Sequence, residues 1–319
     1  MDLHGILLLD KPLHMSSAAA VARAKHLFRA CKAGHTGSLD PLATGMLPIC
    51  FGEATKFGAQ LLDADKTYRV SLRLGERTAS ADRESPVIER REVPQLSQQQ
   101  ILEALAAFPR LYSQVPPMYS ALKQDGRPLY EYARAGVTVE RAARTITILE
   151  MKLVQWQPPT LEFDVRCSKG AYIRVLAEDL AAQLHTIGHL SSLRRLSVAP
   201  FGSEPVWQFE VLEGLGAPRL CELLLPVDAA LLMWRRLDLS ADGVRAIRQG
   251  KSISIGEEGA LDRGASQAGA PVQGVLGPGV PSPGPVRMYA DGLGFLGLGE
   301  IEAAGRLVPR RLISNANQA

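Results

Sequence analysis

Residues 33–57 (AGHTGSLDPLATGMLPICFGEATKF) constrain the fold of this chain more than any other segment. Gly34, Gly37 and Gly45 in this stretch permit backbone conformations with positive φ and a close approach to a ligand. Pro41 keeps the residue before it, Asp40, out of the α region and in an extended or turn conformation. The apolar run at residues 46–51 then fits a buried strand. The segment therefore presents one carboxylate on a constrained loop, which is typical of a functional site, although ordinary turns use the same residue types.

The periodicity of apolar residues predicts strands and helices over the first 200 residues. Residues 161–168 alternate apolar and polar side chains, as expected for a strand with one buried face. Ser16 and Ser17 are good N-caps for a helix whose apolar face runs as far as Cys31. Strands are predicted at residues 5–10, 46–51, 66–74 and 161–168, and helices at residues 18–31, 53–62, 128–135 and from about residue 173.

A second helix start lies at Ser97, which forms a capping box with Gln100 three residues later. Polar residues at 75–86 predict a loop before it, and residues 118–123 predict a strand after it. The side chains of this helix that are predicted to face the core are Ile101, Leu102, Leu105 and Phe108.

The overall charge is only weak evidence for a nucleic-acid partner. A net charge of +3 over 319 residues is small, whereas domains that bind nucleic acids are usually more basic. The basic pairs in the sequence, such as Arg194-Arg195, are each interpreted as solvated surface rather than as phosphate clamps. Hydrophobic content of 46% with 22% charged residues is ordinary for a soluble protein, and the length fits one large domain with a small one.

The four cysteines are widely separated and show no C-x-x-C spacing, which argues against a zinc site and against a disulfide framework. Three of them lie in apolar surroundings and are expected to be buried free thiols. The amino terminus is too short and too acidic for a signal peptide. No apolar run approaches the roughly 18 residues that span a membrane. We expect a reduced, cytoplasmic protein without a membrane segment.

Residues 34–57 resemble the central motif of the bacterial tRNA pseudouridine synthase B family, which acts on uridine 55 in the TΨC arm of tRNA. Two further segments resemble signatures of this family, PPMYSALKQDGRPLYEYAR at residues 116–134 and CSKGAYIR at residues 167–174. The resemblance is strong over most of residues 3–200 and weak over residues 240–313. It implies an α+β fold in which a mixed, largely antiparallel sheet is flanked by helices and followed by a small β-rich barrel of the PUA type.

The resemblance also implies roles for single residues. Asp40 is the expected nucleophile, Arg174 its ionic partner, and Tyr68 an aromatic ring against the target base. The expected catalytic residues are Asp40, Tyr68 and Arg174, and the expected substrate-binding residues are His35, Tyr172, Leu193 and Lys11.

Other matched positions carry weaker implications. Thr78, Ser80 and Asp82 match a family loop, but the glycine expected after the aspartate is missing, which puts the conformation of this loop in doubt. Tyr119 and Lys123 either line an RNA groove or serve as core packing and as a solvated lysine.

The resemblance divides the chain into two domains and a short tail. We expect a catalytic domain at residues 1–236, a PUA-like RNA-binding domain at residues 237–313, and a tail at residues 314–319. A stretch rich in Gly, Pro, Ala and Ser at about residues 258–285 cannot bury a core and is predicted to be a flexible insertion.

The implied reaction breaks the N-glycosidic bond of a uridine, rotates the base and rejoins it through carbon. It needs no cofactor, metal, redox partner or energy source, but it needs a nucleophile, and a carboxylate can serve. Whether Asp40 attacks the base ring or the sugar carbon stays open. The expected partner is the T-arm stem-loop of tRNA, bound by a monomer.

Two other functions compete with this one. The first is a guide-RNA-directed pseudouridine synthase subunit, whose relatives differ around the central motif. The second is an RNA chaperone or binding module without turnover. The presence of Asp40, Tyr68 and Arg174 together argues against a binder alone, because such a protein has no need of a nucleophile.

Overall fold

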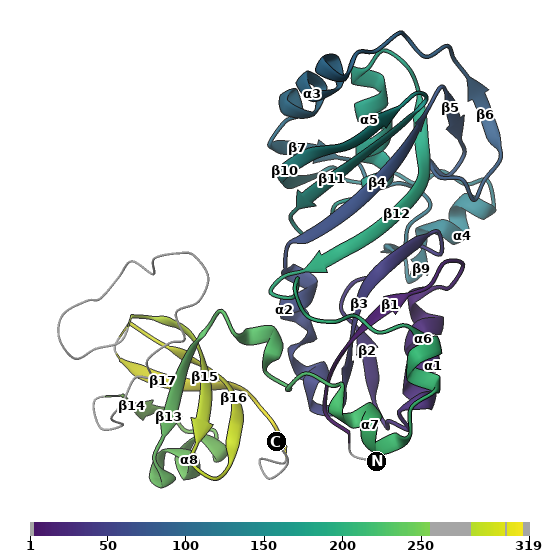
Figure 1. The fold of residues 1–319 in the computed structure, drawn as a ribbon. Coiled ribbons are helices and arrows are strands. Elements are labelled where there is room, and N and C mark those ends of the chain that lie inside the picture. The colour runs from purple at the N-terminus through teal and green to yellow at the C-terminus, as the bar shows by residue number, and fades with distance from the viewer. Residues whose placement is uncertain (1–2, 256–281, 304, 315–319) are drawn as a thin grey trace.

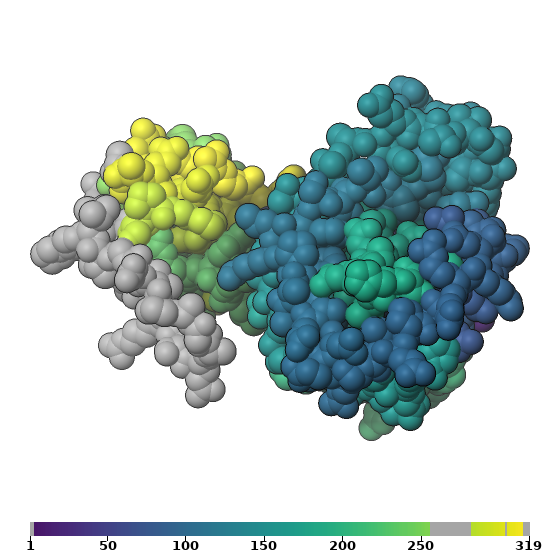
Figure 2. Space-filling model, turned by 90° about the horizontal axis from the view of Figure 1, so that it is seen from above, coloured from purple at the N-terminus to yellow at the C-terminus, as the bar shows by residue number. Residues whose placement is uncertain are grey.

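Two β-sheets organise the chain, a large one built from the first 198 residues and a small one near the C-terminus (Figure 1). The computed structural model describes residues 3–255, 282–303 and 305–314. In space-filling view the two parts lie side by side, with the C-terminal part in green and yellow (Figure 2). Most of the predicted insertion lies outside the described residues, and its last two positions, Gly284 and Pro285, begin a strand.

The large sheet is mixed and largely antiparallel, as the family resemblance implied. Its strand order is β1-β3-β12-β4-β11-β10-β7, with β2 paired to β3. Only the β12–β3 pair is parallel. The strands are β1 (Gly5–Lys11), β2 (Ala33–His35), β3 (Ala43–Phe51), β4 (Lys66–Leu74), β7 (Leu111–Gln114), β10 (Arg144–Gln157), β11 (Thr160–Cys167) and β12 (Gly188–Val198).

Helices flank this sheet and close its core. α3 (Gln98–Ala107) packs on β10, and α5 (Ile173–Gln183) packs on β12 and β4, while α1 (Ser17–Leu27) packs on β2 and β3. Four inward side chains of β11 are fully buried, as its alternation predicted: Leu161, Phe163, Val165 and Cys167. The other helical segments among the described residues are η1 (Gly52–Phe57), α2 (Gly58–Asp63), α4 (Leu129–Arg134), α6 (Phe209–Glu213), α7 (Ala217–Glu222), η2 (Ala229–Leu231) and α8 (Ala241–Arg248).

Two short hairpins lie beside the large sheet. The first pairs β5 (Glu76–Thr78) with β6 (Val87–Arg90), so part of the predicted loop at residues 75–86 is a strand. The second pairs β8 (Lys123–Gln124) with β9 (Arg127–Pro128).

The C-terminal sheet curls around its own apolar core (Figure 1). Its order is β13-β15-β16-β17-β14. The strands are β13 (Arg235–Leu239), β14 (Ile253–Ser254), β15 (Gly284–Ala290), β16 (Gly294–Ile301) and β17 (Arg306–Leu312). Because the sheet buries a separate set of apolar side chains, it forms a second β-rich unit of the kind expected.

The C-terminal unit packs against the large sheet through β16. Phe295 and Leu298 join an apolar cluster that includes Ile6 of β1 and Phe57 of η1. The rings of Phe57 and Phe295 meet edge to face at 5.4 Å between centroids. Lys56 adds hydrogen bonds to the carbonyl of Leu312 at 3.0 Å and the hydroxyl of Ser314 at 2.8 Å.

Four predictions about secondary structure and burial were wrong for local reasons. α1 ends at Leu27 rather than at residue 31, because Arg29 adopts φ +49° and the amide of Ala30 returns to the carbonyl of Lys25. This closes the helix with a left-handed residue that is not glycine. Cys31 is therefore exposed, as is Cys221, so two rather than three of the thiols are buried.

The other two errors concern single segments. Leu102 of α3 is 40% exposed, and Ala104 takes an inward position instead. Residues 118–122 form bends rather than a strand, because the carbonyls of Ser120 and Leu122 accept hydrogen bonds from the amides at the start of α4. None of the helices in the described ranges is both long and apolar enough to cross a bilayer.

Gly45→Ala should destabilise the protein by about 2 kcal/mol or more, because the position combines strain with a clash. Gly45 has φ +99°, and an added Cβ would lie 2.2 Å from the carbonyl oxygen of Arg195 on β12. Gly34→Ala is the matched control, since its Cβ would meet nothing within 4 Å. Urea unfolding of both variants checks this, and equal midpoints would contradict it.

Candidate active site

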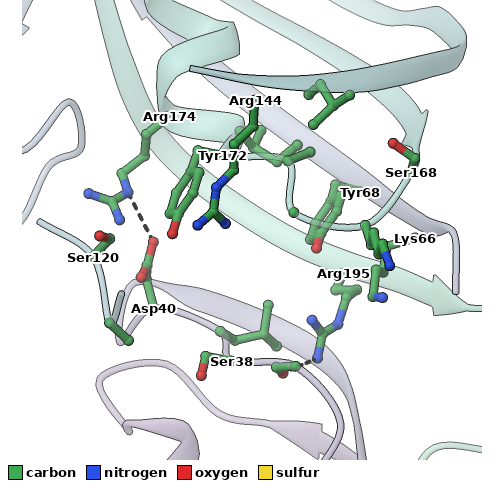
Figure 3. A pocket seen from close by; sticks show the side chains of 18 of the residues that line it. Ser38, Asp40, Lys66, Tyr68, Ser120, Arg144, Ser168, Tyr172, Arg174 and Arg195 are labelled. Atoms are coloured by element: carbon green, nitrogen blue, oxygen red, sulfur yellow. Dashed lines mark hydrogen bonds and ion pairs between the residues drawn. The ribbon is translucent and has the colours of Figure 1, made fainter. Parts of the chain in front are cut away.

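A cavity of about 690 Å³ opens where β4, β12, the start of α5 and the loop after β2 meet (Figure 3). Five of the seven site residues expected from the sequence line it: Asp40, Tyr68, Tyr172, Arg174 and Leu193. They come from segments up to 153 positions apart in the chain, counting from residue 40 to residue 193. The fold therefore gathers most of the predicted site in one place.

Asp40 and Arg174 form an ion pair at one side of this cavity. The Nε of Arg174 lies 3.0 Å from Oδ2 of Asp40. The arginine side chain is 4% exposed and that of the aspartate 41%. The Nη1 and Nη2 groups of Arg174 donate to the carbonyls of Ser80 at 3.2 Å and Tyr119 at 2.6 Å. The guanidinium is thus fixed by two backbone carbonyls and orients a carboxylate that stays open to the cavity.

A second carboxylate, Asp82, lies behind the pair. Its Oδ2 is 3.8 Å from Nε of Arg174, and its Oδ1 accepts hydrogen bonds from the hydroxyl of Ser80 at 2.5 Å and the amide of Glu84 at 3.0 Å. Ala81 takes the positive φ in this loop, at +62°. The loop closes on its own polar side chains and needs no glycine after Asp82.

Tyr68 projects from β4, and its hydroxyl points toward Arg195 (Figure 3). Burial raises the pKa of the Tyr68 phenol above its ordinary value, although the charge of Arg195 opposes the shift. The group therefore stays protonated near neutral pH. Leu193 is buried on β12, opposite Val70 of β4 and Ala43 of β3, and adds an apolar wall.

Tyr172 stands at the N-cap of α5 and is held through its backbone. Its amide donates to Oε1 of Gln114 at 2.7 Å, and Nε2 of Gln114 donates to its carbonyl at 3.0 Å. Burial also raises the pKa of the Tyr172 phenol. Gln114 was not singled out in the sequence, since a lone glutamine carries no pattern.

His35 and Lys11 do not line the cavity. Nδ1 of His35 accepts the amide of Gly37 at 3.4 Å, and burial, followed by the charge of Arg195, lowers its pKa. Lys11 is fully buried, and its ammonium donates to the carbonyls of Pro12 at 2.9 Å and Met15 at 2.6 Å. A role for either residue in substrate binding stays a prediction.

Arg195 was missed, because the Arg194-Arg195 pair was interpreted as solvated surface. Its side chain is 1% exposed, Nε donates to the carbonyl of Met46 at 2.7 Å, and Nη2 donates to that of Gly37 at 3.1 Å. Arg194 instead bonds Asp10 at 2.8 Å. Strand alternation was the missed signal, since Arg195 lies two residues after buried Leu193 and shares its face.

Lys66, another missed residue, lines the cavity beside Tyr68. Its ammonium donates to three carbonyls, those of Leu61, Leu62 and Ala64. Burial lowers the pKa of Lys66 to about 8. Of the two residues with open roles, Tyr119 contributes its carbonyl to Arg174, Lys123 is exposed, and neither lines the cavity.

Within residues 3–255, 282–303 and 305–314, no group of three or more His, Cys, Asp or Glu side chains is placed to hold a metal ion. The cavity walls are instead aromatic and apolar, with charges at its edges. Such a site can hold a planar ring and deliver a carboxylate to it.

Three family models match the sequence. They are described as TruB family pseudouridylate synthase (N terminal domain), over residues 25–173, tRNA pseudouridylate synthase B C-terminal domain, over residues 174–232, and Pseudouridine synthase II TruB, C-terminal, over residues 236–313.

Full-length relatives agree with these matches. The tRNA pseudouridine synthase B of Chromohalobacter salexigens is 46% identical over 99% of this chain and 96% of its own length. The protein of the same name from Nitrosococcus oceani is 44% identical over 98% and 95%.

Solved structures give a more distant likeness. A chain of a Cbf5–Nop10–Gar1 complex superposes with a TM-score of 0.68 at 20% identity, covering 98% of this chain and 84% of that one. A chain of an H/ACA ribonucleoprotein bound to a substrate RNA containing 2′-deoxyuridine gives 0.69 at 18% identity, with coverages of 98% and 86%. At these identities the likeness shows the shared fold alone.

The buried ammonium of Lys11 should make stability depend on pH. Burial lowers its pKa from 10.5 to about 8, although the charge of Asp40 opposes the shift. Below pH 8 the lysine is protonated in both states. Between pH 8 and 10.5 the unfolded chain binds more protons, so the folded state gains stability as pH rises.

We therefore expect the unfolding free energy of the wild type, minus that of Lys11→Met, to increase by roughly 1 to 2 kcal/mol between pH 7 and pH 9.5. Urea titrations at both pH values measure this difference. Lys123→Met, at an exposed position, is the control. A difference that stays constant for Lys11→Met would show the expectation to be wrong.

Proposed function

This chain belongs to the TruB family of pseudouridylate synthases, and we propose from that premise that it converts uridine 55 in the TΨC loop of tRNA to pseudouridine. The single observation that carries the proposal is the ion pair of Asp40 with buried Arg174 at the edge of an aromatic cavity. Relatives that are 44–46% identical over nearly the whole chain carry the name tRNA pseudouridine synthase B.

Asp40 has the properties that a nucleophile needs in this reaction. Its carboxylate is partly exposed toward the cavity and is held by one guanidinium, so one oxygen remains free. Attack at C6 of the uracil or at C1′ of the ribose forms a covalent bond to that oxygen. The glycosidic C1′–N1 bond breaks, the base turns, and C5 then bonds to C1′. Release of the carboxylate, loss of the C5 proton and protonation of N1 complete the isomerisation.

The cavity walls suit a base that has left its stack. A uridine inside a folded tRNA must be extruded and held between aromatic or apolar surfaces. Tyr68, Tyr172 and Leu193 provide such surfaces around Asp40. Exposed Arg144 and Lys169 also line the cavity and are placed to receive the phosphates of the extruded nucleotide.

The C-terminal unit is the proposed affinity module for RNA. We assign a catalytic domain to residues 1–236, a PUA-like RNA-binding domain to residues 237–313, and a tail to residues 314–319. The separate core of the second sheet supports this division, as does the family model that matches residues 236–313. The proposed partner is the T-arm stem-loop, bound by a monomer in the cytoplasm.

The two alternatives receive less support. A guide-RNA-directed subunit rests on structures that share the fold at 18–20% identity, whereas full-length tRNA pseudouridine synthase B relatives share more than twice that identity. A binder without turnover has no use for a buried arginine aimed at an open carboxylate.

Asp40→Asn should melt close to the wild type and still bind a T-arm stem-loop, because the side chain is partly exposed. It should lose at least about 10³-fold in turnover, since an amide of the same shape cannot form the adduct. Release of tritium from uracil C5 measures the reaction.

Asp164→Asn is the matched control. Asp164 also lies in an ion pair, with Arg69 at 2.9 Å, but neither residue lines the cavity. We expect it to retain wild-type turnover. A folded Asp40→Asn protein that reacts within about tenfold of the wild type would exclude Asp40 as the nucleophile.

Tyr68→Phe should bind RNA normally but isomerise it at least about tenfold more slowly, if the hydroxyl assists removal of the C5 proton. Tyr132→Phe provides the comparison, because it deletes a hydroxyl that donates to the carbonyl of Gln124 at 3.3 Å, away from the cavity. It should cost stability and leave turnover unchanged. Equal turnover rates for the two variants would show that the Tyr68 hydroxyl takes no part in the reaction and that the ring serves only in packing.

A further inference from the structure

The turn between β1 and α1 contacts the loop that carries Asp40 on both sides of the aspartate. The amide of His14 donates to the carbonyl of Pro41 at 2.8 Å. Ser17, the first residue of α1, bonds Leu39. The two residues that flank Asp40 are thus both bound to one short segment of the chain.

The contact with Leu39 is unusual because a single hydroxyl hydrogen-bonds both backbone polar groups of that residue, its N–H and its carbonyl. Oγ of Ser17 donates to the carbonyl of Leu39 at 3.0 Å and accepts its amide at 2.7 Å. Ser17 is 4% exposed and Leu39 is also buried. Without the hydroxyl, both polar groups of Leu39 would lose these partners away from water, which buried backbone rarely tolerates.

The turn itself is held in place from within. The ammonium of Lys11 binds the carbonyls of Pro12 and Met15, and His14 adopts φ +62°. On the other side of the aspartate loop, Arg195 binds the carbonyl of Gly37. The backbone that leads to Asp40 is therefore fixed at residues 37, 39 and 41.

These contacts matter because, within the part of the chain that the structure describes, Asp40 itself is held only by the amide of Ala43, which donates to its carbonyl at 3.0 Å, and by Arg174. Its carboxylate faces the cavity and makes one ion pair within 3.5 Å, with Arg174. A displacement of its backbone would carry the side chain away from both the guanidinium and the substrate. A misplacement of about 1 Å can cost about a hundredfold in rate.

We propose that Ser17 is a positioning residue for the isomerisation: its hydroxyl fixes the Leu39 peptide and so sets where the Asp40 carboxylate meets Arg174 and the base. Ser17 does not line the cavity, so it acts through the loop and not on the substrate. This inference rests on the proposed function of Asp40.

The neighbouring serine gives a matched control. Ser16 is the N-cap of α1, and its hydroxyl accepts the amide of Ala19 at 3.1 Å without contacting the aspartate loop. Ser16→Ala should lower the melting temperature by a few degrees, as loss of an N-cap does, and leave kcat unchanged. Ser17→Ala also removes a hydroxyl, one residue later, but it leaves the N–H and the carbonyl of Leu39 without their hydrogen-bond partner.

The experiment measures kcat for tritium release from a saturating T-arm stem-loop, together with the Kd for that RNA and the melting temperature. We expect kcat of Ser17→Ala to fall at least about tenfold while Kd changes less than about threefold, with kcat of Ser16→Ala at the wild-type value. If Ser17→Ala does not fold, Ser17→Cys takes its place, since its thiol is a weak donor and acceptor, and the same split is expected.

The outcomes separate this inference from the proposed function. A wild type that releases no tritium rejects the isomerase assignment, and the inference fails with it. An active wild type, with Ser17→Ala or Ser17→Cys at the kcat of Ser16→Ala, rejects only the role of Ser17. The same holds if the variant loses activity solely through weaker RNA binding.

Discussion

The guanidinium of Arg174 joins four segments of the chain that are distant in sequence. Its side chain projects from the start of α5. It donates hydrogen bonds to the carbonyls of Ser80 and Tyr119 and forms ion pairs with the carboxylates of Asp40 and Asp82. A buried arginine without such partners would be costly. The loops after β2, β5 and β7 therefore converge on α5 because that charge must be satisfied, and the cavity is the space they leave.

β12 connects the two halves of the large sheet and brings the remaining parts of the site together. It pairs in parallel with β3 and antiparallel with β4. Leu193 and Arg195 project from one face of this strand toward the aspartate loop and Tyr68. Gly45 lets β3 approach β12 closely, since any side chain there would strike the backbone of Arg195.

Sequence patterns predicted the elements whose periodicity directly reflects burial. β4 and β11 alternate cleanly, so their positions were confirmed to within a residue or so, and the capping box at Ser97 is formed as expected. The family resemblance named five residues that line the cavity, and their roles remain proposals. The early end of α1 and the bends at residues 118–122 were not predictable from local pattern, because tertiary hydrogen bonds decide them. The burial of Arg195 could have been predicted from strand alternation, but the adjacent Arg194 suggested a solvated pair.

The packing of β16 on β1 and η1 has a geometric consequence. Phe295 and Leu298 lie in one apolar cluster with residues of β1 and β3, the strands that adjoin the aspartate loop. The distance from the C-terminal sheet to Asp40 is then set by side-chain packing and not by the length of a linker. An RNA that contacts both surfaces would therefore meet them at a fixed distance from each other. Under the proposed function, recognition would then depend on the dimensions of a folded RNA, a property that many different base sequences can share.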